Sequence, residues 1–450
     1  MVANSPTAGV IYWFRNDLRL HDQPALHKAI QLATQHQTWL LPIYIHDEAL
    51  DQNTQWGFVR TSAARKTWTA MALRDVSRQL QACQSELIQL TGDPVGVLSA
   101  LCQKLNPMRV ICEDIAAPYE QDHITQLQAA FIPLETIWQS TLMAASDLPF
   151  DVEKVPDTFT NFRHAVEKPG LKVQAPLVSV AQLKSLPPLP PLQAFKTLLA
   201  SISVLPDLSA SSADLSDPRA AFPWGLPEFD GGETCALAHL ARYCNSGLPS
   251  TYKQTRNELV GVDYSTKWSP WLATGALSAR QAWATLKAYE QLHGENESTY
   301  WIGFELLWRD HFRWLHLKHG AKMYHAQGLS KEVLPPPPHR PQQFEAWCAA
   351  NTGHEFIDAG LRELKFTGYV SNRMRQNLAS YLIHDLGCDW RAGAAWFESQ
   401  LIDYDVYSNQ GNWLYLSGRG TDPRGSRRFN PDKQAKDYDP DGRYRALWQH

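Results

Sequence analysis

The sequence predicts an N-terminal α/β domain with a parallel five-stranded sheet of the Rossmann-like kind, a long connector and an all-helical C-terminal domain. Three observations predict this. Short apolar runs alternate with amphipathic stretches over residues 1–140, proline- and serine-rich sequence marks residues 141–224, and apolar residues recur at helical spacing over 225–450. The length of 450 residues also favours two hydrophobic cores over one.

Five short apolar runs in the first part have the length and composition of buried strands. They are residues 10–14, 40–45, 86–90, 109–112 and 134–138. Amphipathic stretches such as 24–34 and 61–80 lie between them, and this alternation predicts right-handed βαβ units and hence a parallel sheet covered by helices. No G-x-G-x-x-G fingerprint of dinucleotide binding follows the first run, which continues into Arg15-Asn16-Asp17.

The connector is most distinct over residues 150–223. It contains the sequence SLPPLPP at 185–191 and a serine- and aspartate-rich run at 208–218. Because proline interrupts strand ladders and serine disfavours a packed core, we expect a long segment that lies on the surface.

The C-terminal part predicts a bundle of helices. Apolar residues at spacings of three and four mark residues 234–245, 278–292, 300–319, 373–386 and 394–402.

Composition excludes several classes of protein. Seven cysteines without a CxxC pair argue against a disulfide framework, a zinc site and an iron–sulfur cluster. The longest apolar runs fall short of the roughly 18 residues that span a bilayer. Since the first nine residues resemble neither a signal peptide nor a transit peptide, we expect a cytoplasmic protein without membrane association.

One predicted helix carries an unusual face. Glu305, Trp308, Arg309 and Phe312 lie at positions i, i+3, i+4 and i+7, so they share one side of a helix. A carboxylate and a guanidinium are costly to bury without partners. Two interpretations stay open: a buried ion pair, or a cavity wall where a flat aromatic ligand stacks on Trp308.

A second set of polar residues combines a helix face with two aspartates. Asn372, Arg375 and Gln376 share one face, and Asp403 and Asp405 follow later in the chain. The aspartates suit acid–base chemistry or a metal, but no histidine or further carboxylate stands at ligand spacing, so no metal is expected. Pairing of Asp403 with Arg375 neutralises both charges and is the more economical arrangement.

Two basic segments allow both an ordinary and a functional interpretation. Hydroxyl groups near Arg256, in residues 252–257 and 264–270, suit a pyrophosphate or simply cap helices. Arginines cluster at 419–428, which indicates a nucleic-acid contact or a solvated loop, whereas the net charge of −4 gives no general preference for nucleic acid.

Together the motifs resemble the photolyase/cryptochrome family over essentially the whole chain. WFRNDLR at 13–19 is similar to the family's N-terminal signature and STKWSPWLATGALS at 265–278 to its flavin-phosphate loop. Resemblance to the DASH cryptochromes rests on five further motifs: GGE at 231–233, YKQTRN at 252–257, FELLWRD at 304–310, TGYVSNRMRQ at 367–376 and KQAKDY at 433–438.

The resemblance implies an FAD molecule buried in the helical domain. The phosphates and the ribityl chain would be held by Tyr252, Arg256, Ser265, Thr266 and Ser269, and the implied site further includes Lys267, Trp268, Arg309 and Asn372. The Asp403–Arg375 pair would lie beside the isoalloxazine with Asp405 near its polar edge. Asn409 matches the asparagine that faces flavin N5, where an amide favours reduced flavin.

The resemblance also implies a light-driven repair of cyclobutane pyrimidine dimers, chiefly in single-stranded DNA. The dimer would stack on Trp308 and form a hydrogen bond with the Glu305 carboxylate. Tyr415 stands where related photolyases have a second tryptophan, and Gln376 replaces the histidine expected of an enzyme for (6-4) photoproducts. The implied DNA-binding set is Glu305, Trp308, Arg373, Gln376, Tyr415 and Arg424.

A blue-light photoreceptor that binds nucleic acid or protein without repair is the alternative. Because the chain ends soon after the core motifs, we expect the enzyme; the sequence names no protein partner.

Two further functions follow from the same resemblance. The inner stations of the family's electron relay to flavin map onto Trp413 and Trp390, while the outermost falls among prolines 335–338. We therefore expect photoreduction either to use another exit, such as a nearby tyrosine or Trp396, or to be slow. An antenna folate, 5,10-methenyltetrahydrofolate, is expected between the domains with Glu120 as its carboxylate partner.

Overall fold

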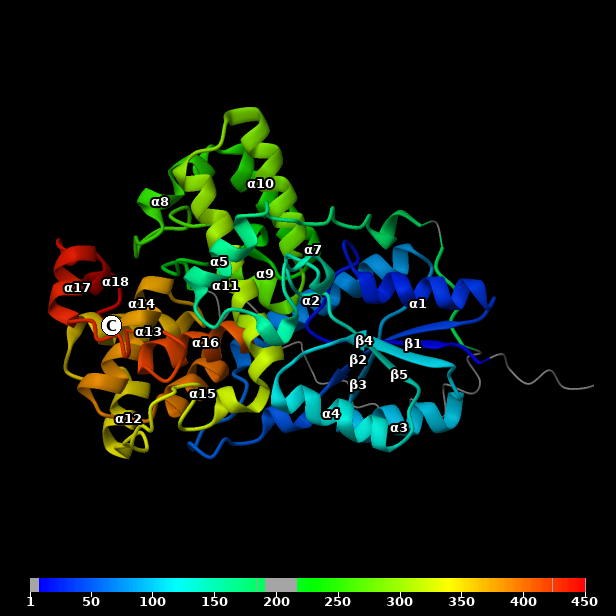
Figure 1. Cartoon of the computed structure of the whole chain (residues 1–450), viewed down its shortest axis with the longest axis horizontal. Coiled ribbons are helices and arrows are strands. Elements are labelled where there is room, and N and C mark those ends of the chain that lie inside the picture. Colours follow the sequence, from blue (N-terminus) through cyan, green and yellow to red (C-terminus); the bar gives the residue numbers. More distant parts are fainter. Residues whose placement is uncertain (1–7, 184, 191–216, 423, 450) are drawn as a thin grey trace, which may run out of the picture.

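The structure, a computed structural model, describes residues 8–183, 185–190, 217–422 and 424–449. An α/β part built around a sheet lies beside a larger helical part (Figure 1). Among the described residues, no helix has both the length and the apolar character needed to cross a membrane.

The predicted parallel sheet of five strands is confirmed. Its strands are β1 (Val10–Phe14), β2 (Leu40–His46), β3 (Ile88–Thr91), β4 (Arg109–Glu113) and β5 (Leu134–Ile137), in the order β3-β2-β1-β4-β5. The third strand begins two residues later than predicted because Leu87 packs in the core before the ladder starts.

Alternation along β1 places its side chains in two cores. Tyr12 and Phe14 pack with residues of α1 (Pro24–Gln35) and α2 (Ala63–Ala82), whereas Ile11 and Trp13 pack with α3 (Pro94–Leu105) and α4 (Pro118–Ala129). Helices therefore cover both faces of the sheet, as expected for parallel strands.

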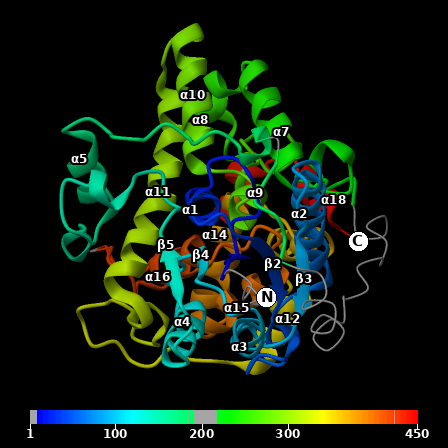
Figure 2. The ribbon, with the colours of Figure 1, turned by 90° about the vertical axis from the view of Figure 1, so that its right-hand side faces the viewer.

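In its described residues, the connector contains one regular helix, α5 (Phe159–Glu167), together with short 3₁₀ turns at Ala145–Asp147, Val152–Lys154 and Val180–Gln182. Figures 1 and 2 both place α5 beside the long helix α11 (Glu297–His319). Most of the serine-rich run predicted at 208–218 lies outside the described residues.

The C-terminal part is helical, as predicted. Its helices are α7 (Glu233–Asn245), α8 (Tyr252–Thr255), α9 (Ser269–Thr274), α10 (Ala279–His293), α11, α12 (Pro341–Cys348), α13 (Glu355–Thr367), α14 (Asn372–Ser380), α15 (Trp390–Gln400), α16 (Val406–Ser417), α17 (Pro431–Tyr438) and α18 (Arg443–Leu447).

Two predicted helix boundaries in this part differ from the structure. Residues 373–386, predicted as one helix, divide into α14 and a π-helical turn at Tyr381–Asp385, which ends before Gly387 with its positive φ of 61°. The helix predicted at 394–402 begins earlier, because the side chain of Asp389 caps α15 by accepting a hydrogen bond from the Arg391 backbone.

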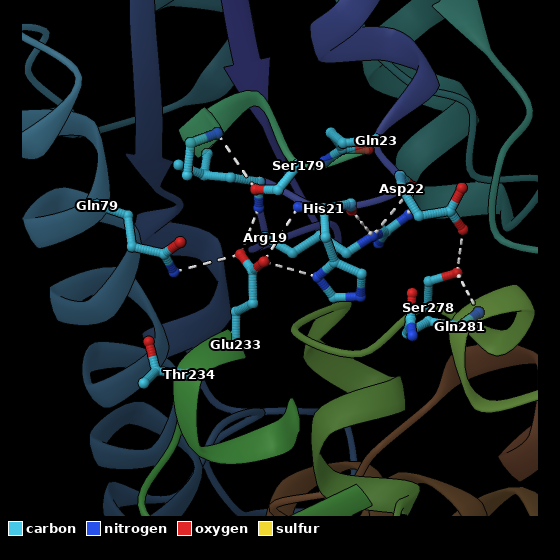
Figure 3. Close-up of polar contacts among 12 residues, drawn as sticks. Arg19, His21, Asp22, Gln23, Gln79, Ser179, Glu233, Thr234, Ser278 and Gln281 are labelled. Carbon is cyan, nitrogen blue, oxygen red and sulfur yellow. Dashed lines mark hydrogen bonds and ion pairs between the residues drawn. The ribbon is translucent and has the colours of Figure 1, made fainter. Parts of the chain in front are cut away.

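Buried carboxylates join the α/β part to the helical part (Figure 3). Glu233, the first residue of α7, accepts hydrogen bonds from the backbone nitrogens of Leu20 and His21 at 2.5 and 3.1 Å and contacts Nδ1 of His21 at 2.7 Å. Asp22 pairs with Arg280 of α10 at 2.8 Å and accepts the Leu177 backbone N–H of the connector. These bonds hold both parts and the connector together.

Gly232 explains part of the GGE motif. Its φ is +100°, and a Cβ on it would lie 2.5 Å from the Cβ of Asp75. Only glycine therefore lets α7 begin this close to α2 and place Glu233 at the junction.

Candidate functional site

A cavity of about 370 Å³ opens among α8, α9, α11, α14 and α16, and a second of about 200 Å³ adjoins it. Both are lined by Ser269, Asn372, Arg375, Gln376, Asp403, Asp405, Ser408 and Asn412. Because eight residues belong to both walls, the two spaces form one site, which we call the central cavity.

The loop before α9 supplies one wall of the central cavity. Thr266, Trp268 and Ser269 line it, together with Tyr252 and Arg256 of the α8 segment. The indole Nε1 of Trp268 is buried without a hydrogen-bond partner among the described residues. This wall thus offers hydroxyls, an N–H donor and a guanidinium, which suit a phosphorylated ligand.

Two residues of the predicted cofactor set do not line this wall. Ser265 is absent from the lining, and the Lys267 ammonium lies 3.2 Å from the ring centroid of Tyr264 in the core. Burial lowers the pKa of Lys267 well below its ordinary value. Their contacts with a cofactor stay predictions.

The predicted ion pair between Asp403 and Arg375 is present. Nη2 of Arg375 lies 2.8 Å from Oδ2 of Asp403, and Ser269 donates to the same oxygen at 2.6 Å. The other carboxylate oxygen, Oδ1, is buried and has no partner among the described residues. The cavity wall therefore holds a fixed acceptor for a ligand N–H.

Asp405 pairs with Arg313, a residue that the sequence analysis missed. Burial acts to raise the pKa of Asp405, but the charges of Arg313 and Arg309 outweigh this effect and lower the pKa to about 2. Asp405 also caps α16 by accepting the Ser408 backbone N–H at 2.8 Å. Arg313 follows Arg309 by four residues and so lies on the same helix face, and this spacing could have indicated it.

Arg309 lines the central cavity but is held by backbone oxygens. It donates to the carbonyls of Ser140 at 2.5 Å and Leu272 at 3.4 Å. Burial lowers its pKa to about 10, with a further decrease from Arg313. Its guanidinium thus fastens α11 to the end of the α/β part and to α9 at the cavity wall.

Glu305 lies on the face for which the sequence left two interpretations open; its ion pair is only half-buried, and the stacked ligand stays a prediction. It forms an ion pair with Arg256, and it also lines the central cavity. Burial raises its pKa, while Arg256 opposes the increase. The guanidinium of Arg256 lies 4.6 Å from the ring centroid of Trp301, which fixes it over the cavity.

The other predicted DNA-binding residues divide into two groups. Trp308, Tyr415 and Gln376 line the central cavity, and the Trp308 and Tyr415 rings meet edge to face at 6.4 Å. Arg373 stands behind the wall and donates to Gln376 at 3.1 Å and to Asn257 at 3.0 Å. Arg424 lines a neighbouring cavity.

Helices α15 and α16 carry the predicted relay residues. Trp413 lines the central cavity, whereas Trp390 is buried outside its lining. Asn409 also lines the cavity, and its amide nitrogen donates to the Ala394 carbonyl at 3.0 Å, so the amide is held in place. Trp396, the predicted alternative exit, is half-buried against Phe58 at 5.0 Å.

Glu120 lies in the first turn of α4, at the boundary with the helical part. Burial raises its pKa, and the nearby Arg15 and Arg60 oppose the increase. Arg60 in turn pairs with Glu398 of α15 at 2.7 Å. Within the described ranges, no group of three metal-ligating side chains is present.

The central cavity fits a flavin dinucleotide. The unpaired oxygen of Asp403 suits a ring N–H, and the hydroxyl-bearing loop with Arg256 suits phosphate oxygens. Aromatic side chains at the opposite wall leave room for a second planar ligand.

Comparison with known proteins agrees with this geometry. Residues 10–183 match the sequence model of the DNA photolyase domain, and residues 301–449 match that of the FAD binding domain of DNA photolyase. Among curated proteins, Cryptochrome DASH of Gloeobacter violaceus is 40% identical over 98% of this chain and 85% of its own length. Cryptochrome DASH of Xenopus laevis is 41% identical over 98% and 83%.

Solved structures have the same fold. A Synechocystis cryptochrome superposes with a TM-score of 0.86 at 37% identity, covering 99% of this chain and 89% of that one. A class III photolyase of Agrobacterium tumefaciens gives a TM-score of 0.75 at 26% identity, covering 99% and 88%.

Proposed function

The chain belongs to the photolyase/cryptochrome family, in its DASH branch, and on this premise we propose that it repairs cyclobutane pyrimidine dimers in single-stranded DNA. One observation carries the proposal. Trp308, Glu305 and Tyr415 line the same cavity as the Asp403–Arg375 pair, so a stacked substrate and the cofactor would share one site.

The cofactor of the central cavity is FAD. We propose that Asp403, Arg375 and Asn409 hold its ring system, and that Tyr252, Thr266 and Ser269 hold its phosphates and ribityl chain. When bound in its reduced form, FAD would supply light-driven electron transfer to the dimer. The apolar part of the wall, to which Trp268 and Leu272 contribute, would exclude water from this site.

The remaining wall residues would bind the dimer. Trp308 offers a flat ring for stacking, and Glu305 offers a carboxylate to the polar edge of a pyrimidine. Arg256, which pairs with Glu305 and lies over Trp301, would instead supply positive charge to the phosphates of the cofactor. Gln376 presents a neutral amide at the same wall, which suits a neutral dimer.

The preference for single strands follows from the cost of extracting the dimer. Flipping a dimer out of a duplex costs a few kcal/mol, and this cost largely disappears when no complementary strand is present. Tyr415 offers a smaller stacking surface than a tryptophan, so less binding energy is available to offset that cost. The exposed Arg424 and Arg428 would follow the backbone of the strand. Arg419, predicted to do the same, is buried and donates to the carbonyls of Ala326 and Pro335, so it is not available to DNA.

An antenna folate between the two parts is a second proposal. Glu120, whose pKa burial raises, lies near Arg60, which pairs with Glu398 of the helical part. A carboxyl group in such a place suits the polar edge of a pterin. Absorption spectra of protein purified with its chromophores, compared with those of Glu120→Ala, would test it through loss of the pterin band.

The test of the repair function uses purified protein with chemically reduced FAD and a single-stranded oligonucleotide that carries one thymine dimer. We expect blue light to restore intact thymines and darkness to leave the dimer unchanged. If the dimer disappears equally in light and in darkness, or does not disappear at all, light-driven repair is excluded. Binding of the oligonucleotide without repair would instead favour a photoreceptor that contacts nucleic acid.

A further inference from the structure

A second cavity, which we call the flanking cavity, adjoins the central cavity. It measures about 340 Å³, and Trp308, Phe312 and Tyr415 line both. Its other walls come from α5, from the segment after α11 and from the loop after α16. The two spaces thus share an aromatic part of their walls.

Aromatic rings form most of the shared wall. Phe159 stacks on Trp308 with 3.7 Å between centroids and 11° between planes, and Phe312 lies 5.4 Å from Trp308. Tyr415 closes the layer at 6.4 Å from Trp308. Rings arranged in this way provide faces and edges against which a further planar ligand can pack.

The rest of the lining combines apolar side chains (Leu315, Met323, Leu329 and Leu414) with polar ones that are mostly neutral. His311 donates from Nε2 to the Pro156 carbonyl at 2.9 Å, and burial lowers its pKa to about 4, so it is uncharged at neutral pH. Asn161 and Thr160 are exposed on α5, and their side chains make no hydrogen bond to other described residues. Amides and hydroxyls of this kind can bond the edge of any nucleobase.

The mouth of the flanking cavity is positively charged. The Asp422 carboxylate is shared by Arg424 at 2.9 Å and Arg427 at 3.2 Å, so two guanidinium groups face one carboxylate. The side chain of Arg424 is 67% exposed, and it lines the cavity. A phosphate group at this mouth would therefore meet an excess of positive charge.

We propose that the flanking cavity holds the nucleobase adjacent to the flipped dimer. This inference rests on the proposed repair function and adds a second subsite to it. Consecutive nucleotides are covalently linked, so a dimer in the central cavity brings its neighbour to the other side of the shared wall. The aromatic rings offer stacking faces to this base, and the polar side chains of the lining match its hydrogen-bonding edge. The arginines at the mouth match its phosphate.

The flanking cavity would also contribute to the preference for single strands. In a duplex the base next to the dimer is paired and stacked, and moving it requires a second disruption of the helix. In a single strand that base is free to leave its neighbours. Binding of the neighbouring base in this cavity would therefore strengthen the binding of single strands more than that of duplexes.

The test measures dark binding of the FAD-loaded protein to fluorescent single-stranded oligonucleotides that carry one thymine dimer. One oligonucleotide is intact, and two others have an abasic site on the 5′ or the 3′ side of the dimer. Base stacking on aromatic side chains predicts that one abasic site weakens binding roughly 5- to 100-fold. A parallel measurement of light-dependent repair of the dinucleotide dimer alone reports on the central cavity.

Two variants fill the flanking cavity from opposite walls. Asn161→Trp adds a ring from α5 and Leu329→Phe adds one from the segment after α11; neither residue lines the central cavity. Each should retain flavin and dinucleotide repair but bind intact and abasic oligonucleotides with equal affinity. Asn161→Ala leaves the cavity open and should keep the difference.

Three outcomes would overturn the inference. Binding that is indifferent to both abasic sites excludes a flanking-base subsite while leaving repair intact. An undiminished abasic effect in both filled variants places the base elsewhere. Failure to bind or repair the dinucleotide dimer removes the repair function itself, and the subsite with it.

Discussion

Arg375 and Asp403 form an ion pair at the wall of the central cavity, with 2.8 Å between Nη2 and Oδ2. They come from helix α14 and from the loop before α16, 28 positions apart in the sequence. The carboxylate is fully buried, and one of its oxygens has no partner among the described residues. The pair therefore places an unpartnered carboxylate oxygen in the wall of the central cavity.

Asp403→Asn should weaken FAD binding and the fold together. The Arg375 guanidinium would lose its compensating charge, which for a buried pair costs about 3 kcal/mol or more. Flavin content by absorbance and unfolding in urea measure the two effects. Asp151→Asn, which breaks an exposed pair with Lys154, is the matched control and should change neither. Full flavin content in Asp403→Asn would contradict the assigned role.

Phe159→Ala should weaken binding of the dimer while FAD remains bound. Without the ring stacked at 3.7 Å, Trp308 loses its support, and the cavity left behind costs about 3 kcal/mol of stability. We expect a higher KM for repair with a smaller change in kcat. Phe131→Ala, at a ring that is 92% exposed, is the control. An unchanged KM would show that Trp308 holds its position alone.

Glu305 should make dimer binding depend on pH. Burial raises its pKa above the ordinary value near 4.5, so the carboxyl changes charge at higher pH than an exposed one. Glu305→Gln should remove this pH-dependent step, and Glu305→Ala should weaken binding roughly 10-fold by removing a hydrogen-bonding group. Dark affinities between pH 4.5 and 8 measure both. An identical pH profile for Glu305→Gln and the parent would contradict the prediction.

Asp22 should contribute to stability at neutral pH but not in acid. Burial acts to raise its pKa, yet the hydrogen bond and the charge of Arg280, together with Arg19, lower it below the ordinary 3.8. Because the pKa of Asp22 is lower in the folded than in the unfolded chain, its charge stabilises the fold at pH values above the unfolded-state pKa of 3.8. This contribution is lost as the pH falls below 3.8. Asp22→Asn should therefore reduce stability at pH 7 by about 3 kcal/mol and flatten the acid dependence.

Unfolding in urea at pH 7 and at pH 3.5 would check the Asp22 prediction by circular dichroism. Asp51→Asn, at an exposed carboxylate paired with Lys66, provides the comparison. Parallel acid dependences for Asp22→Asn and the parent would show that another group controls the junction.

Trp413→Phe and Trp390→Phe should slow the light-driven reduction of oxidised flavin. Both indoles are buried, and Trp413 lines the cavity itself. Repair with flavin that was reduced chemically should be unaffected, because it requires no electron from outside. Flash absorbance measures reduction and the oligonucleotide assay measures repair. Unchanged reduction in both variants would indicate that electrons enter by another route.

The sequence by itself determined the elements. Period-two and period-3.6 patterns are local, so the strands of the sheet and the helices of the C-terminal part were predicted within a few residues. The helix face of Glu305, Trp308 and Arg309 was also visible, since residues three and four apart share a side. The ion pair of Asp403 with Arg375 followed from charge balance alone.

Only the tertiary structure decided which distant residues meet. That Arg256 pairs with Glu305, that Arg313 pairs with Asp405 and that Phe159 of the connector stacks on Trp308 depends on how helices pack across long separations in the chain. No local pattern encodes such contacts. For the same reason Lys267, polar by sequence and set in a predicted phosphate loop, lies in the core beside the rings of Tyr264 and Tyr369, where burial lowers the pKa of its amino group.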